Sequence, residues 1–276
     1  MSLTNSQRRW HLTAFFVLTF AFSWAIEIPL ALSAHGRLSS TVPFGLHYLA
    51  SFGPLFGAIV VTLATEGFRG LGRLVGGLRK WRVPSTYALF AVVAPVLVFG
   101  VVVLASRLLS GSMPDLGLLG QVDYLPDLGV LPVLGLWLLT FGLGEETGWR
   151  AFALPRLQAA RSAFSASMVL GVFWGVWHLP AVFYRDTYLA MGILVLPMLA
   201  LVATVGTVVY TWLFNGTRGS LLVVVLFHGL FDFFSVFPGT VIGPGMGMTI
   251  LMVFWAVRVF KLYGPAHLSP QEKQVV

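Results

Sequence analysis

The chain has 276 residues and a formal net charge of +7; 57% of its residues are hydrophobic and only 10% are charged. A soluble domain has roughly 45–50% apolar and about 25% charged residues, so this chain lacks the polar residues that cover a water-facing surface. The composition excludes a soluble globular protein, a disordered chain and a fibrous protein, and it indicates a polytopic membrane protein.

Eight apolar segments are long enough to cross a hydrocarbon layer of about 30 Å at about 1.5 Å per residue. Backbone donors and acceptors in such a layer must be paired within the segment, so the segments are predicted to be helices. The expected fold class is therefore all-α: a polytopic transmembrane helical bundle that forms a single domain over residues 1–276. The predicted spans are residues 12–33, 43–65, 86–109, 130–154, 163–183, 188–214, 220–237 and 240–262.

Basic residues are distributed unequally between the two sides of the predicted bundle. With eight spans, the termini and the even-numbered loops share one side, which holds 14 of the 17 lysines and arginines. This asymmetry predicts that both termini are cytoplasmic. The basic residues flank apolar segments and form no tract with interleaved aromatics, so we expect no nucleic-acid partner. The opposite loop at 111–127 contains no base and three acids, Asp115, Asp123 and Asp127.

The loop from Glu66 to Ser85 is basic and rich in glycine. Two interpretations of this loop stay open. It is either a short interfacial helix attracted to anionic lipid or a disordered linker. Its first basic residues are Arg69, Arg73, Arg79 and Lys80.

Few ionisable residues lie inside the predicted spans. A charge at mid-bilayer costs at least about 2.5–3.5 kcal/mol on insertion scales, so each intramembrane acid or histidine is a candidate functional residue. Glu27, which precedes Pro29, is expected to face a bundle cavity or to bond a freed backbone amide, and His47 is expected to be interfacial. The other six are Glu145, Glu146, Arg150, His178, His228 and Asp232.

The fourth span carries two adjacent glutamates. On a helix these side chains point about 100° apart, so they cannot share one role. Glu146 and Arg150 are four residues apart in the favoured acid-before-base order, which makes Glu146 a structural partner of Arg150 and leaves Glu145 for chemistry. The alternative is that both glutamates neutralise basic residues at a cytoplasmic helix end.

The fifth span contains His178, with Trp174 four residues earlier on the same face, where it could orient the imidazole. If the chain turns near residue 160, an antiparallel hairpin at about 1.5 Å per residue places His178 opposite Glu145. A packing histidine is the alternative. In the seventh span, His228 and Asp232 share one face. They either form a self-contained pair or face Glu145 and His178 across the bundle.

Three short sequence motifs, one in each of three predicted spans, resemble those of a known protein family. Glu145-Glu146-Thr-Gly-Trp-Arg150, Trp174-Gly-Val-Trp-His178 and His228-Gly-Leu-Phe-Asp232 resemble the motifs of the CPBP family of intramembrane proteases, which includes the type II CAAX prenyl endopeptidases and the Abi proteins. Tryptophan replaces the usual phenylalanine in the second motif, and the third has the aspartate form. The motifs lie within a predicted catalytic core of about residues 130–237.

The resemblance implies an intramembrane endopeptidase that hydrolyses peptide bonds of membrane-associated or lipidated, CAAX-like peptides and proteins. It implies that Glu145 with His178 activates the attacking water. It also implies that His228 with Asp232 stabilises the developing oxyanion. The supporting residues are Glu146, Arg150 and Trp174. We expect the protein to lie in the cytoplasmic membrane of a bacterium or archaeon.

No cofactor follows with certainty. The family is often labelled metalloprotease, and a divalent metal such as zinc would draw its ligands from His178, His228 and Glu145. Cysteine is absent, which excludes cysteine-ligated metals. No His-Glu-x-x-His motif occurs and the polar groups are spread over three helices, so a glutamate-dependent mechanism without an obligatory metal is favoured.

Two other functions stay open. Buried acids and histidines also build the proton relays of membrane transporters. Transporters usually show two repeated halves, whereas the polar groups here crowd into the second half. The remaining alternative is a family member that keeps the fold and binds a membrane partner without cleaving it.

Overall fold

The computed structural model describes residues 3–122, 125–126 and 128–276, and within them all regular structure is helical. Asp123 and Asp127 of the acidic loop lie outside the described residues. Seven helical segments are long and apolar enough to cross a membrane, which confirms the all-α class and an integral membrane protein. The seven are Asn5–Ala34, Phe44–Arg79, Ser85–Ser110, Val130–Gln158, Ala163–Phe183, Gly192–Gly216 and Pro244–His267.

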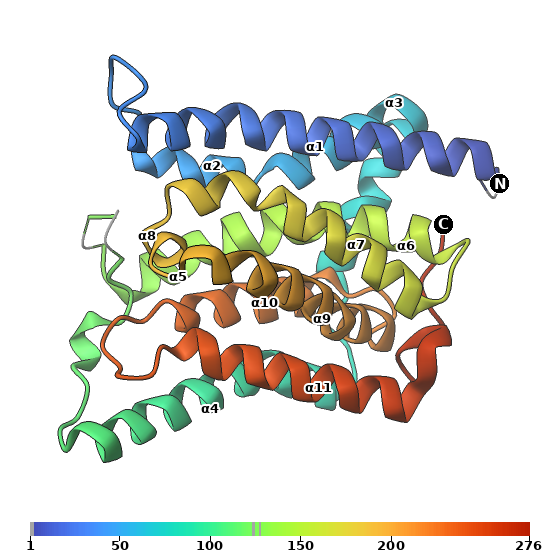
Figure 1. The fold of residues 1–276 in the computed structure, drawn as a ribbon. Coiled ribbons are helices and arrows are strands. Elements are labelled where there is room, and N and C mark those ends of the chain that lie inside the picture. Colours follow the sequence, from blue (N-terminus) through green and yellow to red (C-terminus); the bar gives the residue numbers. More distant parts are fainter. Residues whose placement is uncertain (1–2, 123–124, 127) are drawn as a thin grey trace.

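The long helices lie side by side, and both termini lie at the same end of the bundle (Figure 1). Helix α1 packs along α3, α7 along α9, and α10 along α4, while α11 covers α9. The α-helices are α1 (Asn5–Ala34), α2 (His47–Ala50), α3 (Gly53–Gly76), α4 (Ser85–Ser110), α5 (Val130–Trp137), α6 (Leu154–Gln158), α7 (Ala163–Trp177), α8 (Asp186–Leu189), α9 (Val195–Gly216), α10 (Leu221–Ser235) and α11 (Pro244–His267).

The span predicted at residues 220–237 is shorter than expected. Helix α10 has 15 residues, or about 22 Å at about 1.5 Å per residue, which is less than a hydrocarbon layer of about 30 Å. The side chain of Ser220 accepts a hydrogen bond from the Val223 amide and so caps its start. Helix α10 packs against α4, α9 and α11, and most of its side chains are buried, so its length need not match the lipid. The seventh predicted span is therefore a short apolar helix inside the bundle.

The fourth segment departs from α-helical geometry at the glutamate motif. After α5 the backbone is π-helical over Leu138–Glu145 (η4) and Thr147–Ala153 (η5), before α6 resumes the α-helix. The α-helical geometry assumed for this stretch was wrong. Wider π turns occur frequently at functional sites, and here they direct Glu145 and Glu146 to different neighbours.

Helix α3 is broken at Gly67, whose φ of 61° and ψ of −162° are outside the helical range. Beyond it the chain stays helical to Gly76 and continues as a 3-10 turn (η2, Gly77–Arg79). This stretch crosses the end of the bundle towards α4 rather than running along the long helices (Figure 1). Of the two interpretations of the basic loop, a short helix is confirmed for residues 68–79.

Gly148 permits the close contact between η5 and α3, since an added Cβ would collide with the backbone carbonyl of Pro54. We expect Gly148→Ala to lower the free energy of unfolding by about 1–3 kcal/mol, the usual cost of overpacking. Gly100→Ala is the matched control, because Gly100 lies in α4 with open space at its Cβ. Thermal unfolding in detergent would measure both. Equal losses in the two variants would contradict the contact.

Candidate active site

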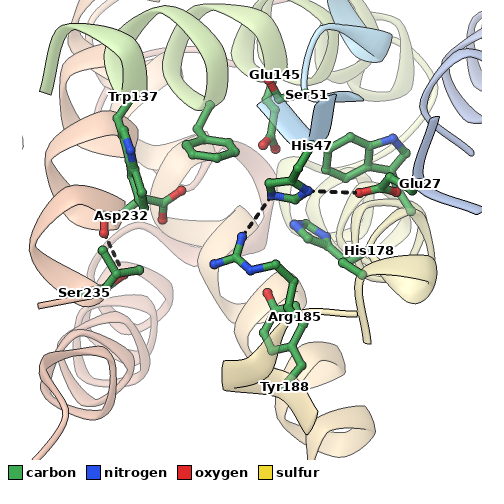
Figure 2. Close-up of a pocket in the computed structure, with 14 residues that line it drawn as sticks. Glu27, His47, Ser51, Trp137, Glu145, His178, Arg185, Tyr188, Asp232 and Ser235 are labelled. Atoms are coloured by element: carbon green, nitrogen blue, oxygen red, sulfur yellow. Dashed lines mark hydrogen bonds and ion pairs between the residues drawn. The ribbon is translucent and has the colours of Figure 1, made fainter. Parts of the chain in front are cut away.

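A buried cavity of about 120 Å³ lies where the three sequence motifs meet. Glu145 from η4, His178 from the end of α7 and Asp232 from α10 all line it (Figure 2). The antiparallel hairpin predicted to place Glu145 opposite His178 is thus confirmed. The volume is large enough to hold several water molecules between these groups.

Trp174 fixes the orientation of Glu145. Its indole Nε1 donates to Oε2 of Glu145 at 2.8 Å, and the glutamate is only 2% exposed. A carboxylate accepts through both of its oxygens, so Oε1 can take a hydrogen bond from a molecule in the cavity. The indole also meets the His178 imidazole edge to face at 5.5 Å between ring centroids, so it contacts His178 as expected and binds Glu145 in addition.

His178 is oriented by the backbone of the same tryptophan. Its Nδ1 lies 2.7 Å from the carbonyl oxygen of Trp174. Because a carbonyl can only accept, Nδ1 carries the hydrogen and Nε2 keeps its lone pair. Helix α7 ends at Trp177, so this bond also satisfies one of the last carbonyls of the helix.

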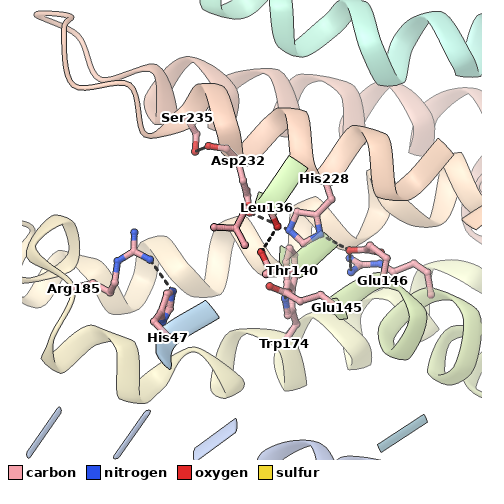
Figure 3. A network of polar contacts seen from close by, with 11 residues as sticks. His47, Leu136, Thr140, Glu145, Glu146, Trp174, Arg185, His228, Asp232 and Ser235 are labelled. Atoms are coloured by element: carbon pink, nitrogen blue, oxygen red, sulfur yellow. Dashed lines mark hydrogen bonds and ion pairs between the residues drawn. The ribbon is translucent and has the colours of Figure 1, made fainter. Parts of the chain in front are cut away.

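His228 lies between two carboxylates (Figure 3). Its Nδ1 is 2.7 Å from Oε1 of Glu146, and its Nε2 is 3.3 Å from Oδ2 of Asp232. Each ring nitrogen thus lies within ion-pair distance of a carboxylate oxygen, an environment that suits an imidazole with a hydrogen on both nitrogens. The predicted pair with Asp232 is confirmed, but it is not self-contained, because Glu146 contacts the same ring.

Arg150 completes this buried cluster. Its Nη1 donates to Oε1 of Glu146 at 2.8 Å, and both side chains are fully buried, which confirms the predicted pair. Its guanidinium carbon lies 4.8 Å from the ring centroid of Trp174 and 4.2 Å from that of Tyr210. Cation–π contacts of this kind are strongest when desolvated.

No pattern in the sequence points to Tyr210. This residue lies in α9 outside every motif, and an aromatic residue in an apolar span is ordinarily a packing residue. Its ring nevertheless covers the Arg150 guanidinium and meets the His228 imidazole edge to face at 5.2 Å between centroids. Tyr210 therefore connects α9 to both cations of the cluster.

Two residues that were not predicted to belong to the site, Glu27 and His47, also line the cavity. The side chain of Glu27 lines the cavity, as one of its two interpretations expected. His47 was expected to be interfacial, but it is only 8% exposed and forms part of the cavity wall. Neither residue lies in a sequence motif, so their proximity to Glu145 becomes visible only because all three line the same cavity.

A directional chain of hydrogen bonds connects Glu27 and His47 with the loop after α7. Arg185 donates from Nη1 to Nε2 of His47 at 2.9 Å, so the imidazole hydrogen lies on Nδ1. That nitrogen lies 2.7 Å from the hydroxyl of Tyr184, which donates to Oε1 of Glu27 at 3.1 Å. Burial raises the pKa of Tyr184, so its hydroxyl stays protonated as a donor.

The residues expected to hold a metal do not form a ligand set. Within the residues that the structure describes, no group of three or more His, Asp or Glu side chains is arranged to bind one. The expected set was Glu145, His178 and His228. Both nitrogens of His228 face carboxylate oxygens, so a metal would have to displace one of these contacts to reach the ring. A preformed zinc centre does not fit these residues.

Comparison with known proteins defines the class of the site. Residues 127–234 match the family model described as "Type II CAAX prenyl endopeptidase Rce1-like". The chain is also similar to CAAX prenyl protease 2 of Methanococcus maripaludis, with 32% identity over 152 residues. The aligned part is 49% of this chain and 52% of the relative, so the chain spans about half the length of that curated relative. All three motifs lie in the matched segment. In this segment the chain is therefore similar to the Rce1-like type II CAAX prenyl endopeptidases, a peptidase family.

Tyr210 offers a test of the cluster. Tyr210→Phe keeps the ring over Arg150 and should leave stability within about 0.5 kcal/mol, whereas Tyr210→Leu removes the cation–π contact and should cost about 2 kcal/mol or more. Thermal or denaturant unfolding in detergent would measure both variants. Equal stability of the phenylalanine and leucine variants would contradict a role for the aromatic ring.

Proposed function

We propose that the protein is an intramembrane endopeptidase that hydrolyses peptide bonds of membrane-associated or lipidated, CAAX-like peptides and proteins. The observation that carries this proposal is the convergence of Glu145, His178 and Asp232 on one buried cavity. The three side chains come from separate elements, and each is costly to bury in a membrane. The family match favours a peptidase over a transporter or a non-catalytic partner-binding protein.

Glu145 and His178 are the proposed general bases. Trp174 occupies Oε2 of Glu145 and Nδ1 of His178, so each group retains one acceptor atom for a water in the cavity. Glu145 takes a proton from this water while the water oxygen bonds to the carbonyl carbon of the peptide. Positioning the base and the water together is the main advantage of such a site.

His228 with Asp232 is the proposed oxyanion stabiliser. An imidazole held as a double donor between two carboxylates supplies a positive charge at the site without further reorganisation. The proton held by Glu145 then passes to the leaving nitrogen, the carbon–nitrogen bond breaks, and the products are a carboxylic acid and an amine. Each step balances without a metal ion, so we propose a metal-independent, glutamate-dependent mechanism.

The proposed orientation places both termini in the cytoplasm, in the cytoplasmic membrane of a bacterium or archaeon. The support is the excess of lysine and arginine at the end of the bundle that carries the termini. A membrane-associated peptide or protein is the proposed partner.

Glu145→Gln should abolish cleavage, with a loss of about 10²–10⁴-fold in kcat, because the amide cannot accept the proton of the water. The assay incubates the purified protein with lipidated peptides, their unlipidated counterparts and transmembrane peptides, and identifies products by mass spectrometry. Asp115→Asn is the matched control, because this exposed carboxylate lies outside the cavity. Full activity of Glu145→Gln would refute the assignment of the base.

The same assay separates the alternatives. A chelator should leave the rate unchanged, and inhibition that zinc reverses would refute the metal-independent mechanism. Proton-coupled flux in proteoliposomes without cleavage of any substrate would instead favour a transporter.

His228→Ala should lower kcat by about 10²–10³-fold with little change in KM, as expected when a positive charge acts mainly on the transition state. Asp232→Asn should retain most of the activity, since an amide oxygen still accepts from the imidazole. Steady-state kinetics of the two variants, with unfolding curves to confirm folding, would test this division. A large rise in KM with unchanged kcat in His228→Ala would assign the histidine to substrate binding instead.

A further inference from the structure

Residues 68–82 form a crossing segment at the end of the bundle that carries both termini (Figure 1). The segment begins after the break at Gly67 and ends just before α4. Three of its apolar side chains are exposed: Phe68 by 84%, Val75 by 40% and Trp81 by 66%. Exposed apolar and aromatic groups on a helix that lies across a membrane protein are typical of the headgroup region.

A basic pocket lies beside this segment. It has a volume of about 590 Å³, and four of its six lining residues are basic. The guanidinium of Arg82 lies over the ring of Trp81, 4.8 Å from its centroid. The lining residues are Arg79, Lys80, Trp81, Arg82, Thr217 and Arg218.

The pocket is held together by contacts between two distant loops. Lys80 donates from Nζ to the carbonyl of Arg218 at 2.6 Å, and Ser220 donates from its hydroxyl to the carbonyl of Lys80 at 2.7 Å. Arg218 has a φ of +54°, a conformation that costs free energy for a residue other than glycine. These bonds fix the positions from which Arg79, Arg82 and Arg218 extend.

The charge of the pocket is not neutralised by nearby acids. Glu66, at the start of this region, pairs with Arg73 and Arg156 instead. Among the described residues, no ion pair joins Arg79, Arg82 or Arg218 to a carboxylate. Three guanidinium groups with this placement suit an anion with several oxygens, because each guanidinium can bind two phosphate oxygens.

We propose that this pocket binds the headgroup of an anionic phospholipid in the surrounding leaflet. The phosphate lies among Arg79, Arg82 and Arg218, and the acyl chains follow the exposed apolar side chains of the crossing segment. A diacyl anionic lipid fits both features, whereas free phosphate uses only the basic residues and phosphatidylcholine carries no net negative charge. This site is separate from the cavity that contains Glu145.

The experiment compares lipid binding by two variants with equal loss of charge. Arg79→Gln/Arg82→Gln/Arg218→Asn removes three charges from the pocket, with asparagine at 218 because it tolerates positive φ. Lys80 is kept because its side chain joins the two loops. Arg9→Gln/Arg258→Gln/Lys261→Gln removes three charges from residues predicted to lie on the same side that do not line the pocket. Native mass spectrometry and thermal unfolding are measured with added phosphatidylglycerol, phosphatidylcholine or inorganic phosphate.

Wild type should bind and be stabilised by phosphatidylglycerol, with a salt-dependent affinity, and much less by phosphatidylcholine or inorganic phosphate. The pocket variant should lose about 100-fold in affinity for phosphatidylglycerol, and the control variant should bind as wild type does. An equal loss of phosphatidylglycerol affinity in the two variants would mean that general charge attraction, and not this pocket, binds the lipid, and would overturn the proposal. Equal stabilisation of wild type by phosphatidylcholine, or by inorganic phosphate alone, would overturn it even if the pocket variant did not fold.

Discussion

One carboxylate oxygen joins the two cations of the buried site. Oε1 of Glu146 lies 2.8 Å from Nη1 of Arg150 and 2.7 Å from Nδ1 of His228. Asp232, which lines the cavity, supplies the second negative charge, so two basic groups face two carboxylates in the interior of the protein. A buried ion loses several kcal/mol of hydration, which only such compensation offsets. This shared contact ties η5 to α10 and thereby sets the distance between the first and third motifs.

The division of roles in the site follows from this balance. His228 is committed as a donor because both of its nitrogens face carboxylates. Glu145 and His178 are held by other atoms of a single residue: the indole and the backbone carbonyl of Trp174. Each therefore keeps an acceptor directed at the cavity. The difference between the two adjacent glutamates is thus a difference of neighbours: Glu145 contacts Trp174, whereas Glu146 contacts Arg150 and His228.

Spacing in the sequence predicted the contacts that act within one helix or one hairpin. The pair Glu146–Arg150 and the pair His228–Asp232 needed only a four-residue interval, and the approach of His178 to Glu145 needed only a helical rise. The ring of Tyr210 and the wider turns at residues 138–153 escaped prediction, because packing between distant segments determines both. The same limit explains the short α10, whose apolar run looks like a span although most of its side chains are buried.

The cavity depends on helices that carry no motif. Glu27 in α1 and His47 in α2 line it, although the family match covers only residues 127–234. Tyr184 donates a hydrogen bond to Glu27, and Arg185 donates one to His47. The loop after α7 is therefore attached to the N-terminal helices by two hydrogen bonds. A buried polar wall of this kind is stable only when all its members are present, since a missing partner leaves an unpaired group away from water. The matched segment therefore supplies the proposed reactive groups, while the first two helices supply Glu27 and His47 to the wall of their cavity.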